Sequence, residues 1–219
     1  MKRQFAVIGL GRFGTGIART LAELDAEVLV IDNNEDKIND AMAFATHAVE
    51  MDATDEAALQ SLGIGNFDVV CVCIGEIQSS IMITLLCKEY GVKHVISKSS
   101  SDLHTKVLER MGADRVVFPE NDTGISMAHK LVSSNILDFI ELSPEYGIAE
   151  FEIYEKWEEK NLVELDFRKK YGLNIIAIRH DGKINVNPTP GNVLHKDDVI
   201  IVVGSEEHIG KLEQLANKR

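Results

Sequence analysis

Short apolar segments alternate with longer segments of helical periodicity over residues 5–120. The segments between them carry apolar residues at a spacing of three to four, which is typical of amphipathic helices. Strands that are apolar on both faces and alternate with helices form a parallel sheet between two helical layers. The six apolar segments are FAVIG, EVLVID, HAVEM, DVVCVCI, HVISK and RVVFPE. The pattern predicts a Rossmann-type doubly wound α/β domain in which Gly63, Gly91 and Gly112 end helices.

A further helical pattern runs from Asp122 to about Phe139, after the predicted sheet is complete. We expect Asn121 or Asp122 to cap this helix. Its apolar face either covers the edge of the sheet or packs on a partner or on the next domain. The segment LSPEYG, residues 142–147, has the composition of a linker. The apolar face of the predicted helix consists of Ile125, Ala128, Leu131, Val132, Ile136 and Phe139.

The last third of the chain has a different pattern, which predicts a small α+β domain. AEFEIYEKWE alternates apolar and charged residues, as a strand with one wet face does, and NLVELDFRKKYG predicts a helix that ends at Gly172. NIIAIRHDGKINV predicts a hairpin that turns at Asp181 and Gly182, and DDVIIVVGSEEHIGKLEQL predicts a strand and a final helix. The expected organisation is a domain over residues 1–121, a crossover helix and linker over 122–147, and a second domain over 148–219. A domain this small buries little surface alone, so we expect it to dimerise.

The string VIGLGRFG places a GxGxxG motif directly after the first strand and at the start of a helix. Gly9 permits the tight turn, Gly11 lets the backbone approach phosphate, and Gly14 lets the helix pack closely on the strand. The helix start, with Arg12 and Phe13, offers free N–H groups to an anion. Asp32 ends the second strand, 18 residues after Gly14, where it can accept both ribose hydroxyls and repel a 2′-phosphate. The combination predicts a nucleotide site.

Other polar residues follow the strand ends at the same edge of the sheet. Asp52 could receive the amino group of adenine or cap a helix together with Thr54 and Asp55. Ile74 and Gly75 could face the nucleoside or form an ordinary turn.

Three charged residues at this edge could lie close to the phosphates of a nucleotide. Arg12, inside the glycine turn, could meet a third phosphate or be merely solvent-exposed. Lys98 could pair with phosphate or carboxylate, and Glu120 could bind a divalent cation carried by phosphates. Both could also be ordinary surface charges.

Charge and composition narrow the range of partners. With 23 basic and 35 acidic residues the net charge is −12, which disfavours nucleic acid and anionic lipid. No apolar run approaches the roughly 20 residues that cross a bilayer, and we expect a cytosolic protein. Cys71, Cys73 and Cys87 lack zinc spacing and are expected to be buried hydrophobes.

A catalytic constellation is not apparent in the sequence. His180, His195 and His208 occupy turn-like or helix-edge positions without an evident carboxylate partner, and we expect them to be solvated. A GxxxxGK[ST] loop does not occur, which excludes a P-loop ATPase. Binding without chemistry is the leading interpretation, and an NAD-dependent oxidoreductase is the alternative because Asp32 suits NAD.

The motifs resemble, over residues 4–215, the regulator-of-potassium-conductance (RCK or KTN) family. FAVIGLGRFG, EVLVIDNNEDKI, MDAT, CIGE, VISK and GADRVVFPE come in the order found in the cytoplasmic regulatory subunits of bacterial Ktr-type potassium uptake systems. The resemblance implies homodimers that assemble into an octameric ring on the cytoplasmic face of a membrane-embedded potassium transporter. It implies activation by ATP and inhibition by ADP, with NAD or NADH bound by some relatives.

The resemblance also assigns roles to residues. Arg12 would meet the γ-phosphate, Asp32 and its neighbours the ribose, and Glu120 a cation between two facing nucleotide sites. Cyclic di-AMP would bind at the dimer interface of the C-terminal domain. The remaining implied nucleotide contacts are Asn33, Asn34, Lys37, Asp52, Ala53, Ile74, Gly75 and Lys98, and those for cyclic di-AMP are Arg168, Asn174, Ile175, Ile176 and Pro188.

Overall fold

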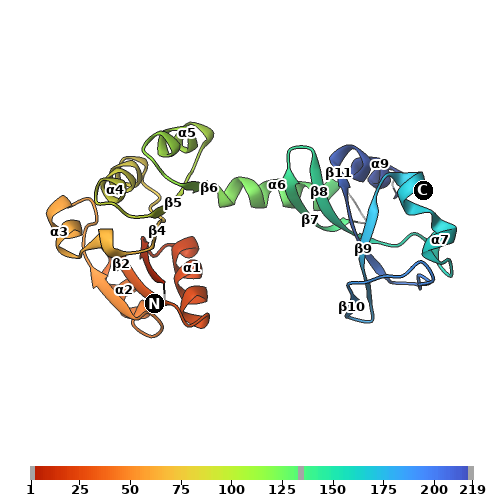
Figure 1. Ribbon diagram of the computed structural model, residues 1–219, viewed down its shortest axis with the longest axis horizontal. Coiled ribbons are helices and arrows are strands. Elements are labelled where there is room, and N and C mark those ends of the chain that lie inside the picture. The colour runs from red at the N-terminus through yellow and green to blue at the C-terminus, as the bar shows by residue number, and fades with distance from the viewer. Residues whose placement is uncertain (1–2, 133–135, 217–219) are drawn as a thin grey trace. The chain divides into compact units, whose positions relative to one another are not determined.

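The computed structural model describes residues 3–132 and 136–216 of the chain. The chain divides into two compact units between Glu120 and Asn121. Figure 1 shows strands alternating with helices in the N-terminal unit and a sheet with short helices in the C-terminal unit.

The N-terminal unit is a six-stranded parallel sheet in the order β3-β2-β1-β4-β5-β6. The order reverses direction between β1 and β4, and open α/β sheets bind ligands outside the carboxyl ends of the strands at such a point. Its strands are β1 (Gln4–Ile8), β2 (Glu27–Asp32), β3 (His47–Glu50), β4 (Val69–Val72), β5 (His94–Lys98) and β6 (Arg115–Val117). Its helices are α1 (Arg12–Glu23), α2 (Glu35–Ala41), α3 (Glu56–Ser61), the 3-10 turn η1 (Ile64–Asn66), α4 (Ile77–Glu89) and α5 (Asp102–Arg110).

Side chains alternate between the two faces of this sheet, so its strands bury apolar residues on both sides. Val7 packs with Ala18 of α1 and Ile38 of α2 on one face. Ile8 packs with Leu59 of α3 and Ile83 of α4 on the other face. The predicted doubly wound α/β domain is confirmed. The prediction that Gly63, Gly91 and Gly112 end helices is confirmed as well. Each has a positive φ, of +67°, +82° and +96° respectively, as glycines that follow the last turn of a helix commonly do.

The C-terminal unit is built on a five-stranded antiparallel sheet in the order β10-β9-β11-β8-β7. Its core contains the only tryptophan, Trp157, which is 2% exposed and packs edge-on against Phe167, with ring centroids 4.8 Å apart. The strands are β7 (Ile136–Ser143), β8 (Tyr146–Glu152), β9 (Asn174–His180), β10 (Lys183–Asn185) and β11 (Val199–Ser205). The helices are α6 (Pro119–Val132), which starts at the end of the N-terminal unit, η2 (Glu155–Trp157), α7 (Leu162–Leu165), α8 (Phe167–Tyr171) and α9 (Glu206–Ala216).

The helix expected over Asp122 to Phe139 was wrong at both ends. It begins earlier, at Pro119, because proline suits the first position of a helix, so Asn121 and Asp122 lie inside it and do not cap it. Ile136 and Phe139 belong to strand β7. The register of β7 shifts between Ile136 and Asp138, and this bulge puts both apolar side chains into one core. A spacing of three residues, which suggested a helix, therefore arises from a bulged strand. Residues 133–135 of the predicted helix lie outside the described residues.

The expected linker over residues 142–147 was also wrong. Ser143 pairs with Tyr146 across a tight turn, which makes β7 and β8 a hairpin. Pro144 favours the first central position of such a turn, and the Ser143 hydroxyl accepts a hydrogen bond from the Glu145 N–H at 3.3 Å. The strand expected for AEFEIYEKWE ends at Glu152 and gives way to the 3-10 turn η2.

Candidate functional site

The glycine turn between β1 and α1 has the geometry of an anion site. Gly9 has a backbone φ of +95°, a conformation that residues with a side chain rarely adopt. A Cβ on Gly14 would stand 1.9 Å from the Gly9 carbonyl oxygen, so only glycine lets α1 approach the turn this closely. Gly11 has open space around its missing Cβ, and no side chain caps the start of α1. The first N–H groups of the helix are thus left for a ligand.

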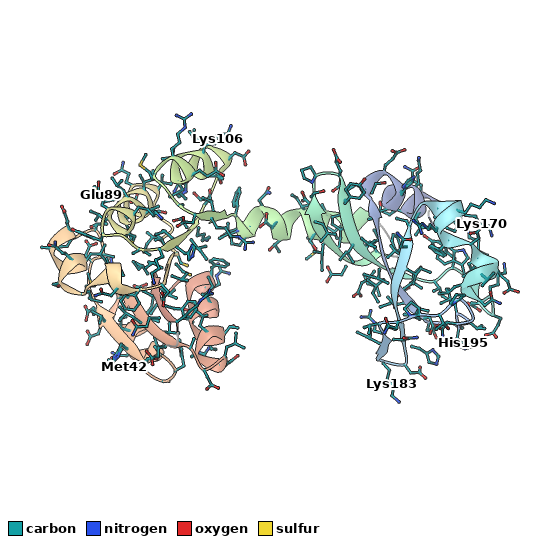
Figure 2. All side chains as sticks on the ribbon, viewed as in Figure 1. Met42, Glu89, Lys106, Lys170, Lys183 and His195 are labelled. Carbon is teal, nitrogen blue, oxygen red and sulfur yellow. The ribbon has the colours of Figure 1, made fainter. Side chains whose placement is uncertain are left out.

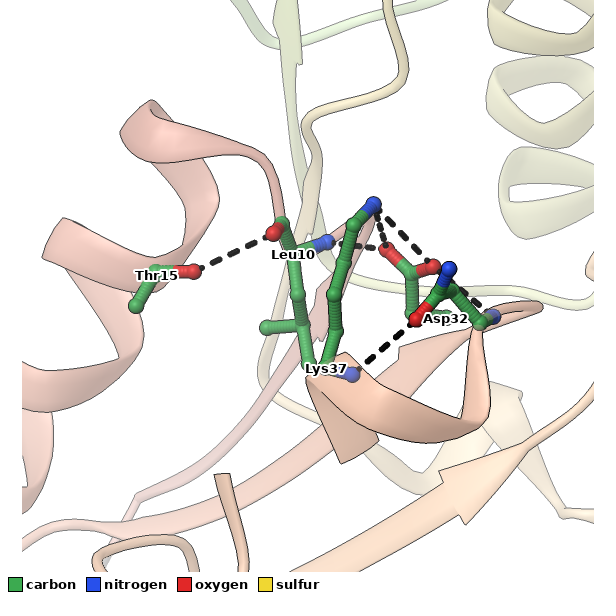
Figure 3. Close-up of polar contacts among 5 residues, drawn as sticks. Leu10, Thr15, Asp32 and Lys37 are labelled. Atoms are coloured by element: carbon green, nitrogen blue, oxygen red, sulfur yellow. Dashed lines mark hydrogen bonds and ion pairs between the residues drawn. The ribbon is translucent and has the colours of Figure 1, made fainter. Parts of the chain in front are cut away.

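Asp32, at the end of β2, is held in place by the backbone and is only 6% exposed. Its Oδ2 accepts a 2.6 Å hydrogen bond from the Leu10 N–H, and its Oδ1 accepts one of 3.0 Å from the Asn34 N–H. The Lys37 ammonium donates to both carboxylate oxygens, at 3.2 and 3.3 Å (Figure 3). Asp32 is therefore a fixed carboxylate beside the glycine turn, paired with Lys37.

A cavity of about 420 Å³ opens at the carboxyl ends of β1 and β4. This volume suits a small-molecule ligand. Ile83 forms part of its apolar wall, together with Ile8 and Ile31. The structure brings the following predicted residues to its lining: Gly9, Gly11, Asp32, Asn33, Lys37, Asp52, Ala53, Ile74 and Gly75. Arg12, Phe13, Gly14, Asn34, Lys98 and Glu120, all described, lie outside that lining.

Two acids at the rim of the cavity have local structural roles. Asp52 accepts hydrogen bonds from the Thr54 hydroxyl, at 2.7 Å, and from its N–H, at 2.9 Å, which lower the pKa of Asp52. The cap of α3 is Asp55, so the suggestion that Asp52 caps this helix was wrong. Glu76, which the sequence reasoning did not single out, lines the cavity and caps α4 by accepting from the N–H groups of Gln78 and Ser79. Its place directly after Gly75 at a strand end was the available signal.

The three charges expected beside the phosphates form a group of their own. Lys98, at the end of β5, donates a 2.6 Å hydrogen bond to Glu120 Oε1 in the first turn of α6. This bond lowers the pKa of Glu120, and the positive charge of Arg12 adds to the effect. Arg12 is exposed as the first residue of α1. Arg12, Lys98 and Glu120 thus form a mixed cationic and anionic cluster.

The three thiols are buried. Burial raises the pKa of Cys71 to about 11 and those of Cys73 and Cys87 to about 12. Cys71 and Cys73 pack in one core cluster, as expected for small buried hydrophobes.

In the C-terminal domain, a shallow hollow of about 290 Å³ brings together three of the residues implied for cyclic di-AMP. Arg168 of α8 lies there with Asn174 and Ile175 of β9. Ile176 is the unpaired residue of a bulge in β9 and is 38% exposed, and neither it nor Pro188, both described, lines the hollow.

The side chains of His180 and His195 are about half exposed, at 52% and 49%, as expected, but both have carboxylate partners that the sequence did not reveal. His180 Nδ1 lies 2.6 Å from Asp198 Oδ1, and His195 Nδ1 lies 3.1 Å from Glu159 Oε1. The hydrogen bond to Asp198 raises the pKa of His180. His208 bonds instead to the Ser205 hydroxyl, at 2.9 Å. These pairs join residues 18 and 36 positions apart, which local spacing does not reveal.

Two further features are absent from the described parts of the chain. Over residues 3–132 and 136–216, no helix combines the length and apolar character needed to span a bilayer. Over the same residues, no three His, Cys, Asp or Glu side chains converge as metal ligands, and the Glu120 carboxylate is occupied by Lys98.

Comparison with known proteins matches both units to described domains. Residues 5–119 match the TrkA-N domain and residues 148–217 the TrkA-C domain. The chain is 46% identical to Ktr system potassium uptake protein C of Bacillus subtilis (strain 168), over 98% of this chain and 97% of that protein. It is 43% identical to Ktr system potassium uptake protein A of the same strain, over 96% of each.

Among solved structures, the GsuK RCK domain matches with a TM-score of 0.69 and 19% identity. The match covers 100% of this chain and 48% of that one, and at this identity it supports the fold alone. The sequence identities confirm the resemblance inferred from the motifs. The chain belongs to the TrkA-N/TrkA-C family and, by its identity with them over nearly their full length, to the family of the Ktr system potassium uptake proteins.

Proposed function

We propose that the chain senses adenine nucleotides and, through them, gates a membrane-embedded potassium transporter from the cytoplasmic side. The observation that supports this most is the cavity itself. It joins the uncapped start of α1 to a buried carboxylate at the sheet's reversal point. That combination suits a phosphate at one end and a ribose at the other.

The phosphate end distinguishes ATP from ADP in this proposal. Arg12 supplies a fixed, exposed cation at the start of α1, where a third phosphate would extend beyond the helix terminus. Lys98 supplies a second cation, now held by Glu120. A triphosphate would draw Lys98 toward itself and free the Glu120 carboxylate to hold a cation carried by the nucleotide.

Gating then follows from linked equilibria. We propose that homodimers assemble into a ring of eight chains with an ATP-favoured, activating shape and an ADP-favoured, inactive one. A ligand shifts such an equilibrium only by its differential affinity, and tenfold is worth about 1.4 kcal/mol per site. Coupled sites multiply this factor, so a modest preference becomes a decisive switch.

The C-terminal domain adds an inhibitory input in this proposal. Arg168 and the Asn174 amide could bind the phosphates of cyclic di-AMP, with Ile175 as an apolar floor. A second copy of the domain would supply the facing half of the site. Ile176 and Pro188 would contribute from outside the hollow of a single chain.

The mass of the assembly, measured by light scattering with ATP and with ADP, tests the proposal. We expect a ring of eight chains whose hydrodynamic radius differs between the two nucleotides. A monomer or dimer that oxidises NADH steadily with any metabolite would instead support an NAD-dependent oxidoreductase. Abolition of that turnover by Asp32→Ala would then place the oxidoreductase site in the same cavity.

A further inference from the structure

Two helices of the N-terminal unit begin at the cavity that we propose for a nucleotide. The cavity is lined by Gly11, which precedes α1, and by Glu76, which precedes α4. Helix α4 runs from Ile77 at this end to Glu89, which is labelled in Figure 2, at the other. The first N–H groups of a helix carry a partial positive charge, so each of these two helix starts could attract a phosphate.

The two helix starts differ in what their own residues place there. At α1 no side chain caps the helix and the first turn carries no acidic residue, so the N–H groups remain available. At α4 the Glu76 carboxylate accepts hydrogen bonds from the N–H groups of Ser79, at 2.6 Å, and Gln78, at 3.0 Å. These two bonds lower the pKa of Glu76, so its carboxylate is charged at neutral pH. The start of α4 is thus already occupied by an anion that belongs to the chain.

The wall that α4 contributes to the cavity suits a base better than a phosphate. Ser79 and Ile83 lie one turn apart on α4 and both line the cavity, so one face of this helix forms the wall. Ile83 shares the lining with Ile8 and Ile31, and all three side chains are at most 1% exposed. A phosphate would lose its hydration against these apolar groups, whereas the faces of a base would pack on them. The wall therefore favours an uncharged ring at the α4 side of the cavity.

We propose that Glu76 is a specificity-determining residue whose carboxylate excludes phosphates from the start of α4 and thereby directs them to α1. The inference rests on the proposed nucleotide site and selects one of two orientations in it. The phosphates lie at the open helix start, Asp32 holds the ribose, and the base faces the apolar wall. A fixed negative charge repels a polyanion and leaves an uncharged nucleoside unaffected. Glu76 thus selects by charge which end of the nucleotide approaches α4.

Calorimetry of the full chain with sodium tripolyphosphate, adenosine and ATP as separate probes tests the proposal. Glu76→Gln removes the charge and leaves an amide oxygen that can still accept a hydrogen bond from the start of α4. Without the repulsion, tripolyphosphate should bind this variant about tenfold more tightly than the wild type. Adenosine should bind both equally, because it carries no charge. ATP should gain less than tripolyphosphate, because its base occupies the α4 side of the cavity.

Asp55→Asn is the matched control for charge and for capping. Asp55 caps α3 by accepting from the N–H groups of Ala57 and Ala58, but it does not line the cavity. The control therefore repeats the change in net charge at another helix start and should leave the tripolyphosphate affinity unchanged. Glu76→Ser, which offers an uncharged hydroxyl as the cap, is a second variant and should show the same gain as Glu76→Gln. Far-UV circular dichroism shows whether each variant is folded.

The outcomes separate the role of Glu76 from nucleotide sensing itself. Equal tripolyphosphate affinity in the wild type and in the folded Glu76 variants, including binding by none of them, would overturn the proposal. So would an equal gain in Asp55→Asn, because the effect would then come from net charge alone. A wild type that binds no ATP would contradict nucleotide sensing, whereas a tripolyphosphate gain confined to the Glu76 variants would still support the exclusion of phosphates from α4.

Discussion

The nucleotide cavity of the N-terminal domain is shaped mainly by backbone groups, whereas the hollows of the C-terminal domain are shaped mainly by pairs of side chains. In the cavity, backbone N–H groups fix Asp32, and Gly14 lets α1 approach the turn after β1 closely. In the C-terminal domain, side-chain pairs such as His180 with Asp198 hold a hairpin and an irregular segment together. A site made by backbone is rigid before its ligand arrives, whereas a site made by side chains on turns depends on the ligand or a partner to complete it.

The largest effect that tests this contrast is expected from Gly14→Ala. The added Cβ would meet the Gly9 carbonyl oxygen at 1.9 Å, so α1 must shift away from the turn. We expect loss of nucleotide binding and a destabilisation of about 1–3 kcal/mol in the N-terminal domain, by urea unfolding followed with far-UV circular dichroism. Trp157 fluorescence, which reports the C-terminal domain, should be unchanged.

Gly16→Ala is the matched control on the same helix. Its Cβ would meet nothing within 4 Å, so this change should stabilise α1 by up to about 1 kcal/mol and preserve binding. If the two variants behaved alike, the close approach at Gly14 would not be what shapes the turn.

The next largest effect is expected from Asp32→Asn. The amide keeps one acceptor oxygen but presents an NH₂ group toward the donors that now converge on the carboxylate. A hydrogen bond to a charged group contributes about 1.5–3 kcal/mol to binding. Its loss should weaken the binding of ATP and of ADP by roughly 10- to 150-fold, as measured by calorimetry. Unchanged affinity would remove Asp32 from the site. Lys37→Met, which frees Asp32 without replacing it, controls for the lost ion pair.

Arg168→Ala tests, from the C-terminal domain, whether the two domains hold separate ligand sites. Removing this cation from the α8–β9 hollow should weaken cyclic di-AMP about tenfold and leave ATP affinity unchanged, since the site proposed for ATP lies in the other unit. Lys169→Ala is the control, because Lys169 lies on the same helix but does not line that hollow. A parallel loss of ATP binding in Arg168→Ala would contradict the assignment of separate sites.

A smaller effect concerns pH and the buried His104 of α5. Burial lowers the pKa of His104, and its Nε2 has no hydrogen-bond partner although the ring is only 3% exposed. The unfolded chain therefore takes up the proton more readily than the folded one. The resulting stability is present above the unfolded pKa of about 6.5 and is lost as the pH falls through the lowered value. Urea unfolding of the N-terminal domain between pH 7 and pH 5 should show this loss, and His104→Gln should reduce it.

Much of the N-terminal domain could be predicted because its signals are local. Six apolar segments, the glycine motif and Asp32 are each readable within a few residues, and nine of the predicted contacts line the cavity. Arg12, Lys98 and Glu120 were placed at the right edge, but their pairing across two strand ends depends on the fold.

The C-terminal domain was predicted less completely because its determinants are distant in sequence or mimic other patterns. The bulge in β7 gave Ile136 and Phe139 the spacing of a helix, and Pro144 gave a hairpin turn the composition of a linker. The pairing of β9 with β11 brings Asp198 to His180, and loop segments that pair outside the named strands bring Glu159 to His195. Local periodicity does not encode such pairings.

The measurement that tests nucleotide sensing most directly is the ratio of ATP to ADP affinity in the wild type and in Arg12→Ala, by calorimetry on the full chain. If Arg12 meets the third phosphate, the variant should lose roughly tenfold or more in ATP affinity and little in ADP affinity. An equal loss for both nucleotides, or no binding of either by the wild type, would contradict the account.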